Sequence, residues 1–305
     1  MPFRYDEIGQ RLKAFRLGSG LSADEVARSI GISRTALYRF EKGELAKIET
    51  IERLAELLEV SIPTLLGVGI EYVSSAVSYF ERIRQIEETA EHIIVLAGPI
   101  SYLLSSDPFQ SVLEEMLRES IPPDLPTRER ALADVAVILE ILQQRKETYR
   151  KRRPGIVNLM SALEIERLLI NGFTGKTLIP EDEQRRRRAL AYAEVEYFAR
   201  LIEEDPIGIQ IGLVTGTLPQ AGFQIFRQQE RKILSISPFR LGEHPNVRVG
   251  VAMITSAPEA LLLHEKAVKD MWSTALKGHA ASAYLRDLLA ATEPQARSVR
   301  RISSI

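Results

Sequence analysis

The hydrophobic positions of the first 66 residues repeat at helical spacing and predict five short helices. Ile8, Leu12 and Phe15 lie at i, i+4 and i+7, so they share one face of a helix that is closed by Gly18 and Gly20. Further apolar stripes follow at residues 26–30, 37–40, 51–58 and 62–66. Short helices separated by small turn residues predict a compact helical domain over residues 1–68.

Polar residues at the starts of the second and third helices define how these two helices are joined. Ser22, with Glu25 three residues later, is a capping box that opens the second helix. Gly31 accommodates a sharp turn with a left-handed backbone, and Ser33 is a good N-cap for the third helix. Two short helices joined by a turn containing glycine predict a helix-turn-helix, whose second helix fits the major groove of DNA.

Residues 6–66 resemble the Cro/XRE family of lambda-repressor-like DNA-binding domains. The resemblance is carried by the segments IGQRLKAFRLGSGLSADEVARSIGISRTALYRFEKGE and IETIERLAELLEVSIPTLL. It implies a DNA-binding domain that reads a palindromic operator as a homodimer, because one such domain buries too little surface for a specific site. The family often has Gln at the start of the second helix, where it contacts a phosphate. Ala23 stands there in this sequence, so that contact is not implied.

The resemblance also implies which residues contact DNA. These are Ser22, Ser33, Arg34, Thr35, Tyr38, Arg39, Lys42 and Lys47. Arg34, Thr35 and Tyr38 are the expected readers of base edges, since Arg pairs with guanine and the methyl group of Thr contacts thymine. The other five are expected at or near phosphates. The alternative for each charged residue is an ordinary solvated surface position.

The overall charge does not argue against DNA binding. The formal net charge of the chain is −1, and residues 1–70 carry ten basic and ten acidic side chains. Residues 28–47, however, hold five basic residues against Glu41 and Glu44, a local excess of three. Positive charge is therefore concentrated around the expected recognition helix.

Beyond residue 72, short apolar runs alternate with longer helical patterns. Strands are expected at 92–98, 155–160, 207–214 and 247–255, with a hairpin over 222–239. Helices are expected at 72–91, 127–153, 181–204 and 258–276, with another capped by Ser161. This alternation predicts an α/β domain with a mostly parallel central sheet over residues 73–291. The two long helices at 72–91 and 127–153 are the expected dimer elements.

Two further segments complete the expected organisation. The sequence GVGIEYVSS at 67–75 combines glycines with a serine pair, which predicts a linker between the two domains. The last 14 residues, 292–305, have a basic and polar bias and are expected to be a disordered tail.

Residues 206–277 resemble the degenerate phospholipase-D-like effector domains attached to some prokaryotic regulators. The resemblance is carried by a strand, the hairpin GFQIFRQQERKILSISPF, the strand VRVGVAMIT and the closing DMWSTAL. It implies a domain that senses a small-molecule effector. A GAF-like or PAS-like sensor is the alternative, and the long helices count against it.

A parallel sheet binds ligands beyond the carboxyl ends of its strands, and this rule gives a candidate effector site. The expected ligand-binding residues are Gly98, Ser101, Ser161, Thr215, Gly216, Phe239, Arg240 and His244. An arginine beside an aromatic ring is suited to holding the carboxylate of an apolar ligand, which is the expected role of Arg240. The alternative is that Arg240 pairs with Glu243 and these loops only close the fold.

Motifs for catalysis are incomplete. In the segment HEKAVKD, at 264–270, three residues separate Lys266 from Asp270, where a phospholipase-D motif has four. A zinc-peptidase motif would need His where Val268 stands, and a P-loop ending at GFTGKT would need Gly where Ile170 stands. There is no Cys, and the four His are scattered. We therefore expect no catalytic, metal or cofactor site.

These observations predict a homodimeric transcriptional regulator with an effector-sensing C-terminal domain. The alternatives are a DNA-targeted enzyme with a phospholipase-D-like domain and an antitoxin-like DNA binder without a ligand; repression and activation both stay open. The start MPFRYDEIGQ has no apolar signal segment, and no apolar run approaches the roughly 18–20 residues that span a bilayer. A soluble, cytoplasmic protein is expected.

Overall fold

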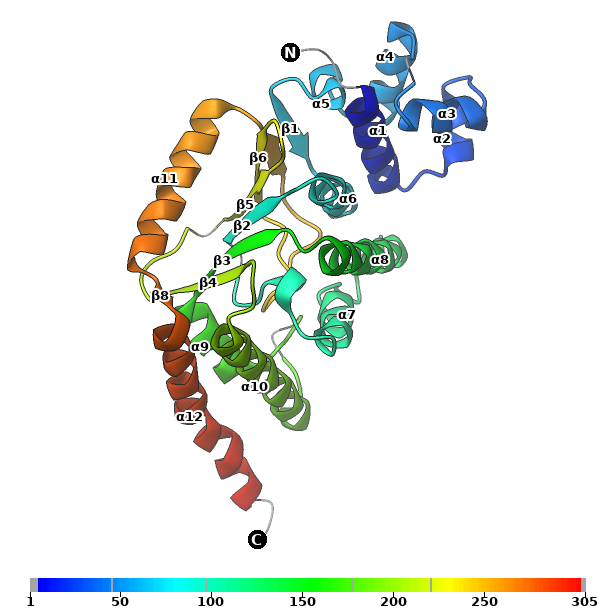
Figure 1. Cartoon of the computed structure of the whole chain (residues 1–305). Coiled ribbons are helices and arrows are strands. Elements are labelled where there is room, and N and C mark those ends of the chain that lie inside the picture. The colour runs from blue at the N-terminus through cyan, green and yellow to red at the C-terminus, as the bar shows by residue number, and fades with distance from the viewer. Residues whose placement is uncertain (1–4, 45, 97, 177, 220, 303–305) are drawn as a thin grey trace.

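The computed structural model describes residues 5–302 except 45, 97, 177 and 220, with side chains described as far as residue 292. Figure 1 shows a small helical part, here called the head (residues 5–66), beside a larger part built around a sheet, here called the body (residues 70–302).

The head consists of the five short helices that the sequence predicted. They are α1 (Tyr5–Ser19), α2 (Ala23–Ser29), α3 (Arg34–Glu41), α4 (Ile48–Leu57) and α5 (Ile62–Leu66). Leu12, Val26 and Leu37 lie in their common core, each at most 3% exposed. Gly9 lets α1 approach α3 closely, because a Cβ atom there would lie 2.5 Å from the carbonyl oxygen of Phe40.

An eight-stranded sheet forms the centre of the body. Its strands are β1 (Ile70–Val73), β2 (His92–Leu96), β3 (Gly155–Ser161), β4 (Ile209–Val214), β5 (Gly222–Arg227), β6 (Lys232–Ser237), β7 (Ala252–Thr255) and β8 (Leu276–Lys277). Their order across the sheet is β1-β7-β6-β5-β2-β3-β4-β8. The hairpin expected over 222–239 is formed by β5 and β6.

The prediction of a mostly parallel sheet was wrong. Only the β2–β3 and β3–β4 pairs are parallel, and the other five neighbouring pairs are antiparallel. A buried strand has a continuous apolar sequence in either direction, so the pattern that located the strands did not give their orientation. The strand expected at 247–255 is also shorter, because it begins only at Ala252, after Gly250 adopts a φ of +136°.

Helices cover both faces of the sheet (Figure 1). They are α6 (Ala76–Glu87), α7 (Phe109–Glu119), α8 (Arg128–Arg152), α9 (Ala162–Asn171), α10 (Glu181–Glu204), α11 (Pro258–Thr274) and α12 (Gly278–Ile302), with a 3-10 turn at Tyr102–Leu104. On one face, Ile93 and Ile156 share a core with α6, α8, α9 and α10. On the other face, Leu159 and Ile225 pack with Leu261 and Val268 of α11.

The segment expected to be a linker is part of the sheet. β1 lies within 67–75 and pairs antiparallel with β7, from Ile70 opposite Thr255 to Val73 opposite Ala252. Glu71 and Val73 are buried. A four-residue strand between glycines and serines is too short to be recognised from its own sequence pattern. The head is therefore joined directly to an edge of the sheet.

The C-terminal segment also differs from expectation. Residues 292–302, expected to be disordered, continue the backbone of α12 as helix, while residues 303–305 lie outside the described part of the chain.

Candidate nucleic-acid interface

The helix-turn-helix is held at the start of α2 and at the turn between α2 and α3. The Ser22 hydroxyl accepts a hydrogen bond from the Glu25 amide at 3.2 Å, and the Glu25 carboxylate accepts one from the Ser22 amide at 2.8 Å. Gly31 takes a left-handed conformation with φ of +71°. The guanidinium of Arg53 on α4 donates to the Ile30 carbonyl at 2.9 Å. These contacts hold α2 and α3 in a defined helix-turn-helix geometry.

Helix α3 presents one free face and one buried face. It begins at Ser33, whose hydroxyl accepts a hydrogen bond from the Ala36 amide at 3.1 Å. Leu37 is fully buried against the head core. The exposed residues on the opposite face include four of the predicted DNA-contacting residues, Arg34, Thr35, Tyr38 and Arg39. Residues three and four apart share one side of a helix, so these side chains form one surface.

Arg34 and Tyr38 form a unit on this surface. The Arg34 guanidinium donates to the Tyr38 hydroxyl at 3.1 and 3.3 Å, and its central carbon lies 5.3 Å from the ring centroid. The hydrogen bond with Tyr38 raises the pKa of Arg34 above its ordinary value, with Asp24 adding to the effect. Arg34 is thus a charged donor whose direction is set by Tyr38 before any DNA is bound.

The predicted phosphate-contacting residues lie around the ends of α3. Arg39 pairs with Glu44 at 2.6 Å. Lys42 at the end of α3 and Lys47 before α4 are exposed, and neither forms an ion pair within the described residues. The hydroxyl of Ser22 is already bound to Glu25 at 2.7 Å, so a phosphate would have to compete for it. Ala23 is buried.

The carboxylates that pair with Arg34 and Arg39 were not predicted from the sequence. Asp24 of α2 pairs with Arg34 at 3.1 Å, across ten residues and the turn. Glu44 follows Arg39 by five residues, which is not a helical spacing. If Arg34 and Arg39 contact DNA as predicted, contacts with phosphates or bases would replace both pairs.

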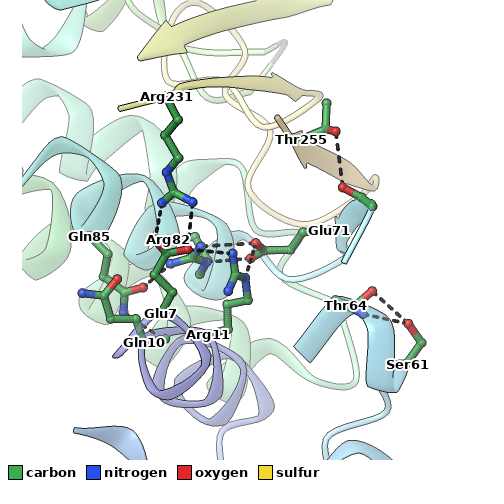
Figure 2. A network of polar contacts seen from close by, with 11 residues as sticks. Glu7, Gln10, Arg11, Ser61, Thr64, Glu71, Arg82, Gln85, Arg231 and Thr255 are labelled. Carbon is green, nitrogen blue, oxygen red and sulfur yellow. Dashed lines mark hydrogen bonds and ion pairs between the residues drawn. The ribbon is translucent and has the colours of Figure 1, made fainter. Parts of the chain in front are cut away.

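A buried ionic network joins the head to the body (Figure 2). Its centre is Glu71 of β1, which accepts hydrogen bonds from Arg11 of α1 at 3.0 Å and from Arg82 of α6 at 2.6 Å. All three side chains are at most 10% exposed. Burial acts to raise the pKa of Glu71, but the charges of Arg82 and Arg11 outweigh it and keep that pKa below its ordinary value. Glu71 is therefore ionised at neutral pH.

Further contacts extend this junction beyond Glu71. Arg231, in the turn between β5 and β6, pairs with Glu7 of α1 at 2.6 Å. Gln85 of α6 donates to the carbonyl of Gln10 at 3.1 Å, and Arg130 of α8 donates to the carbonyl of Ser19 at 2.6 Å. The head is thus docked against the body along the whole length of α1.

Docking of the head buries one of the two helices that were expected to form the dimer interface. α6, the structural counterpart of the helix expected at 72–91, packs between α1 and α8, and eleven of its twelve residues are buried. Its surface is therefore occupied within the chain. α8, the counterpart of the helix at 127–153, turns mainly polar side chains outward: Arg128, Glu129, Glu140, Gln143, Gln144 and Glu147.

The strands that precede the predicted ligand-binding residues are arranged as expected. β2, β3 and β4 are parallel neighbours, so Gly98, Ser161 and Thr215 lie at or just after strand ends on the same side of the sheet, where the carboxyl ends of these strands meet. The loop after β6 folds over this side of the sheet, where a Cβ atom on Gly242 would lie 3.0 Å from Pro99. None of the three cavities described here is lined by any of the eight predicted residues.

The hydroxyl residues and the glycine on this side of the sheet lie in different environments. Ser161 caps α9 by accepting a hydrogen bond from the Glu164 amide at 3.2 Å. Ser101 is 3% exposed and precedes the 3-10 turn. Thr215 and Gly216 are exposed to solvent.

The predicted residues of the loop after β6 also differ in their exposure to solvent. Phe239 is buried and packs against Tyr79 with ring centroids 5.6 Å apart, whereas Arg240 and His244 are exposed. The alternative pairing of Arg240 with Glu243 is not seen. The buried Glu243 carboxylate instead binds Arg167 and Asn171, each at 2.8 Å.

His264 is the first residue of HEKAVKD, the segment that most resembles a catalytic motif. Its side chain has packing contacts within the fold. Its Nδ1 atom lies 2.8 Å from the Ala260 carbonyl oxygen, and its ring meets Phe223 edge to face at 4.9 Å. No group of three or more His, Asp or Glu residues suited to a metal ion occurs in the described part of the chain. Within residues that the structure describes, no helix is both long and apolar enough to cross a membrane.

Comparison with known families agrees with the geometry of the head. Residues 7–66 match the family model of a helix-turn-helix domain, which spans the five head helices and no part of the body. A search of curated proteins finds no match to the chain. With the fixed turn between α2 and α3 and the exposed basic face of α3, this match identifies the head as a helix-turn-helix domain and indicates a DNA-binding regulator.

Proposed function

We propose that the chain is a sequence-specific transcriptional regulator of the lambda-repressor-like (Cro/XRE) type, without enzymatic activity, that acts as a homodimer in the cytoplasm. We further propose that a small-molecule effector bound to the body modulates its affinity for a palindromic operator. The observation that carries the proposal is that the outer face of α3 is free while the head is docked on the body.

The orientation of the docked head is compatible with DNA reading. α1 and β1 face the body through the Glu71 network, whereas α3 packs on α1 and α2 and lies on the far side of the head from the sheet (Figure 1). α3 can therefore enter a major groove without undocking. We infer that the docked arrangement is the DNA-binding form.

A rigid junction also provides a route from body to head. Two heads of a dimer read half-sites that are about 34–36 Å apart, or multiples of that spacing. If each head moves with its body, an effector that changes how two bodies meet changes the separation of the heads. The change in operator affinity is limited by the difference in effector affinity between the two arrangements.

Cross-linking of the docked head tests this proposal. The chain has no Cys, so the pair Gly18→Cys and Ser78→Cys introduces the only thiols, at positions where α1 and α6 touch. A duplex selected from a random library by the full-length protein serves as the operator. We expect the oxidised, cross-linked protein to bind this duplex as tightly as the reduced protein does.

The single variant Ser78→Cys is the control for oxidation itself. Loss of binding in the cross-linked protein, restored by a reductant, would show that the docked head is the inactive form. Failure of the selection to enrich any sequence would contradict sequence-specific reading.

A further inference from the structure

The largest cavity described in the body opens at the outer edge of β4 and has a volume of about 670 Å³. It lies between the C-terminal end of α10, the end of α11 and the start of α12. β8 pairs only with Gly212 and Leu213, so residues 209–211 of β4 border the cavity instead of another strand. A cavity of this size accommodates a small organic molecule.

One wall of the cavity is apolar and aromatic. Trp272, the only tryptophan of the chain, lies against β4 at Gly212. A Cβ atom at Gly212 would come within 2.8 Å of the indole atom Cζ3, so the glycine makes room for the ring. Leu201 and Ile209 extend this wall with aliphatic surface. Such a wall is suited to an apolar group of a ligand.

Two opposite charges also line the cavity. Lys277 donates to the Trp272 carbonyl at 2.7 Å and lies 5.2 Å from the centroid of the indole ring. Asp205 is exposed at the end of α10. Within the described residues, neither of these two side chains forms an ion pair. Glu203, the third charged side chain, is already bound by both arms of the Arg286 guanidinium, at 3.2 and 3.0 Å.

We infer that this cavity binds a zwitterionic α-amino acid with an apolar side chain. The ligand carboxylate pairs with Lys277, its ammonium pairs with Asp205, and its side chain packs on Trp272. A ligand with only one charge would make one charge-assisted hydrogen bond fewer, with either Lys277 or Asp205, and would therefore bind more weakly. The inference rests on the proposed function only in naming the class of effector; the site itself is tested without DNA.

The intrinsic fluorescence of Trp272 gives a direct readout, because no other tryptophan contributes to the signal. The probes are L-phenylalanine, phenylpropionate and phenethylamine, which share the ring and carry both charges, the carboxylate alone or the ammonium alone. In the full-length protein we expect a saturable change with L-phenylalanine and binding at least about tenfold weaker for the other two. Isothermal titration calorimetry measures the same three affinities independently.

Matched variants separate the site from the rest of the fold. Lys277→Ala and Asp205→Asn should each lose the response to L-phenylalanine, while Lys269→Ala and Asp270→Asn, on the exposed side of α11, should keep it. Far-UV circular dichroism checks that each variant is folded, and Lys277→Gln replaces Lys277→Ala if the latter is not.

Three results would overturn the inference. The zwitterion is ruled out if phenylpropionate or phenethylamine binds as tightly as L-phenylalanine, or if Asp205→Asn keeps full affinity. The cavity is ruled out if none of the three probes gives a saturable signal by fluorescence or calorimetry. Operator binding by the same variants without ligand is scored separately, so loss of the ligand site leaves the DNA-binding proposal standing.

Discussion

Two surfaces of the head carry arginine–carboxylate pairs in opposite environments. On the exposed surface around α3, Arg34 and Asp24 pair at 3.1 Å with side chains that are 56% and 53% exposed. On the docking surface, Arg11 of the head pairs with Glu71 of the body at 3.0 Å, with side chains that are 10% and 4% exposed. The chemical groups are the same, and the access of water differs.

This difference decides what each surface can do. An exposed ion pair contributes about 0–1 kcal/mol, so its arginine can exchange a carboxylate for a phosphate or a base at little cost. Removal of one partner of a buried pair leaves a charge without water or counterion, which costs about 3–5 kcal/mol. The exposed pairs around α3 are therefore exchangeable, and the buried pairs of the docking surface are structural.

The largest effect is expected on the stability of the fold, from the substitution Glu71→Ala. Arg11 and Arg82 would then lie buried beside each other without their shared counterion. We expect the free energy of unfolding, measured by urea denaturation, to fall by about 3–5 kcal/mol. The control is Glu88→Ala, whose more exposed pair with Arg84 should contribute less than about 1 kcal/mol. Equal effects of the two substitutions would remove the distinction between the surfaces.

Acidification should act on the same junction to a smaller extent, because a protonated Glu71 keeps its shape and some of its hydrogen bonding. The pKa of Glu71 is lower in the folded protein than its ordinary value of 4.5. Its stabilising contribution is therefore present above pH 4.5 and is lost as the pH falls through the folded-state pKa. Hydrogen exchange in α1 should increase in this acidic range. In the variant Glu71→Gln, hydrogen exchange in α1 should depend less on pH. The same pH profile in both proteins would contradict the role of Glu71.

A middle-sized effect is expected for Arg34→Ala on operator binding. Loss of the guanidinium should cost about 1–3 kcal/mol and relax the preference at one base position. Fluorescence anisotropy with the operator and with single-base variants measures both quantities. Lys42→Ala is the comparison, since loss of a phosphate contact should weaken all sequences alike and flatten the salt dependence. Unchanged affinity and preference in Arg34→Ala would place the recognition surface elsewhere.

The smallest effect is expected for Asp24→Asn. The pair with Arg34 is exposed to water and screened by it, so the melting temperature should hardly change. DNA affinity should rise slightly, because Arg34 no longer has to leave a carboxylate and one negative charge is gone. Glu49→Gln on α4 is the control for the charge alone. A fall in affinity would show that Asp24 orients Arg34 for binding instead of competing for it.

What the sequence could predict depended on the range of the interactions. The head was predictable because its signals are local: Ser22, Gly31 and Ser33 have the capping and turn roles that their neighbours imply. The long helices of the body were located for the same reason, at 128–152 and 181–204. Strand direction was not predictable, since it depends on pairing and not on apolar pattern.

The contacts of the junction and the environments of the predicted ligand residues could not be predicted from the sequence either. Arg11 and Glu71 are 60 residues apart, and Gln85 meets Gln10 over 75. No periodicity links such positions. Gly98, Ser161 and Thr215 do follow neighbouring parallel strands, but the side chains and loops that fill the space beyond them could not be anticipated.

The position of β1 has a consequence for dividing the protein into fragments. β1 covers the hydrogen-bonding edge of β7, which lies next to it in the sheet. A body that begins after residue 73 would expose that edge, with unpaired backbone groups able to join another chain. Such a fragment should aggregate more readily than one that begins at residue 68, whose edge strand β1 carries the charge of Glu71. The strand that follows the head thus also replaces an apolar edge of the body with a charged one.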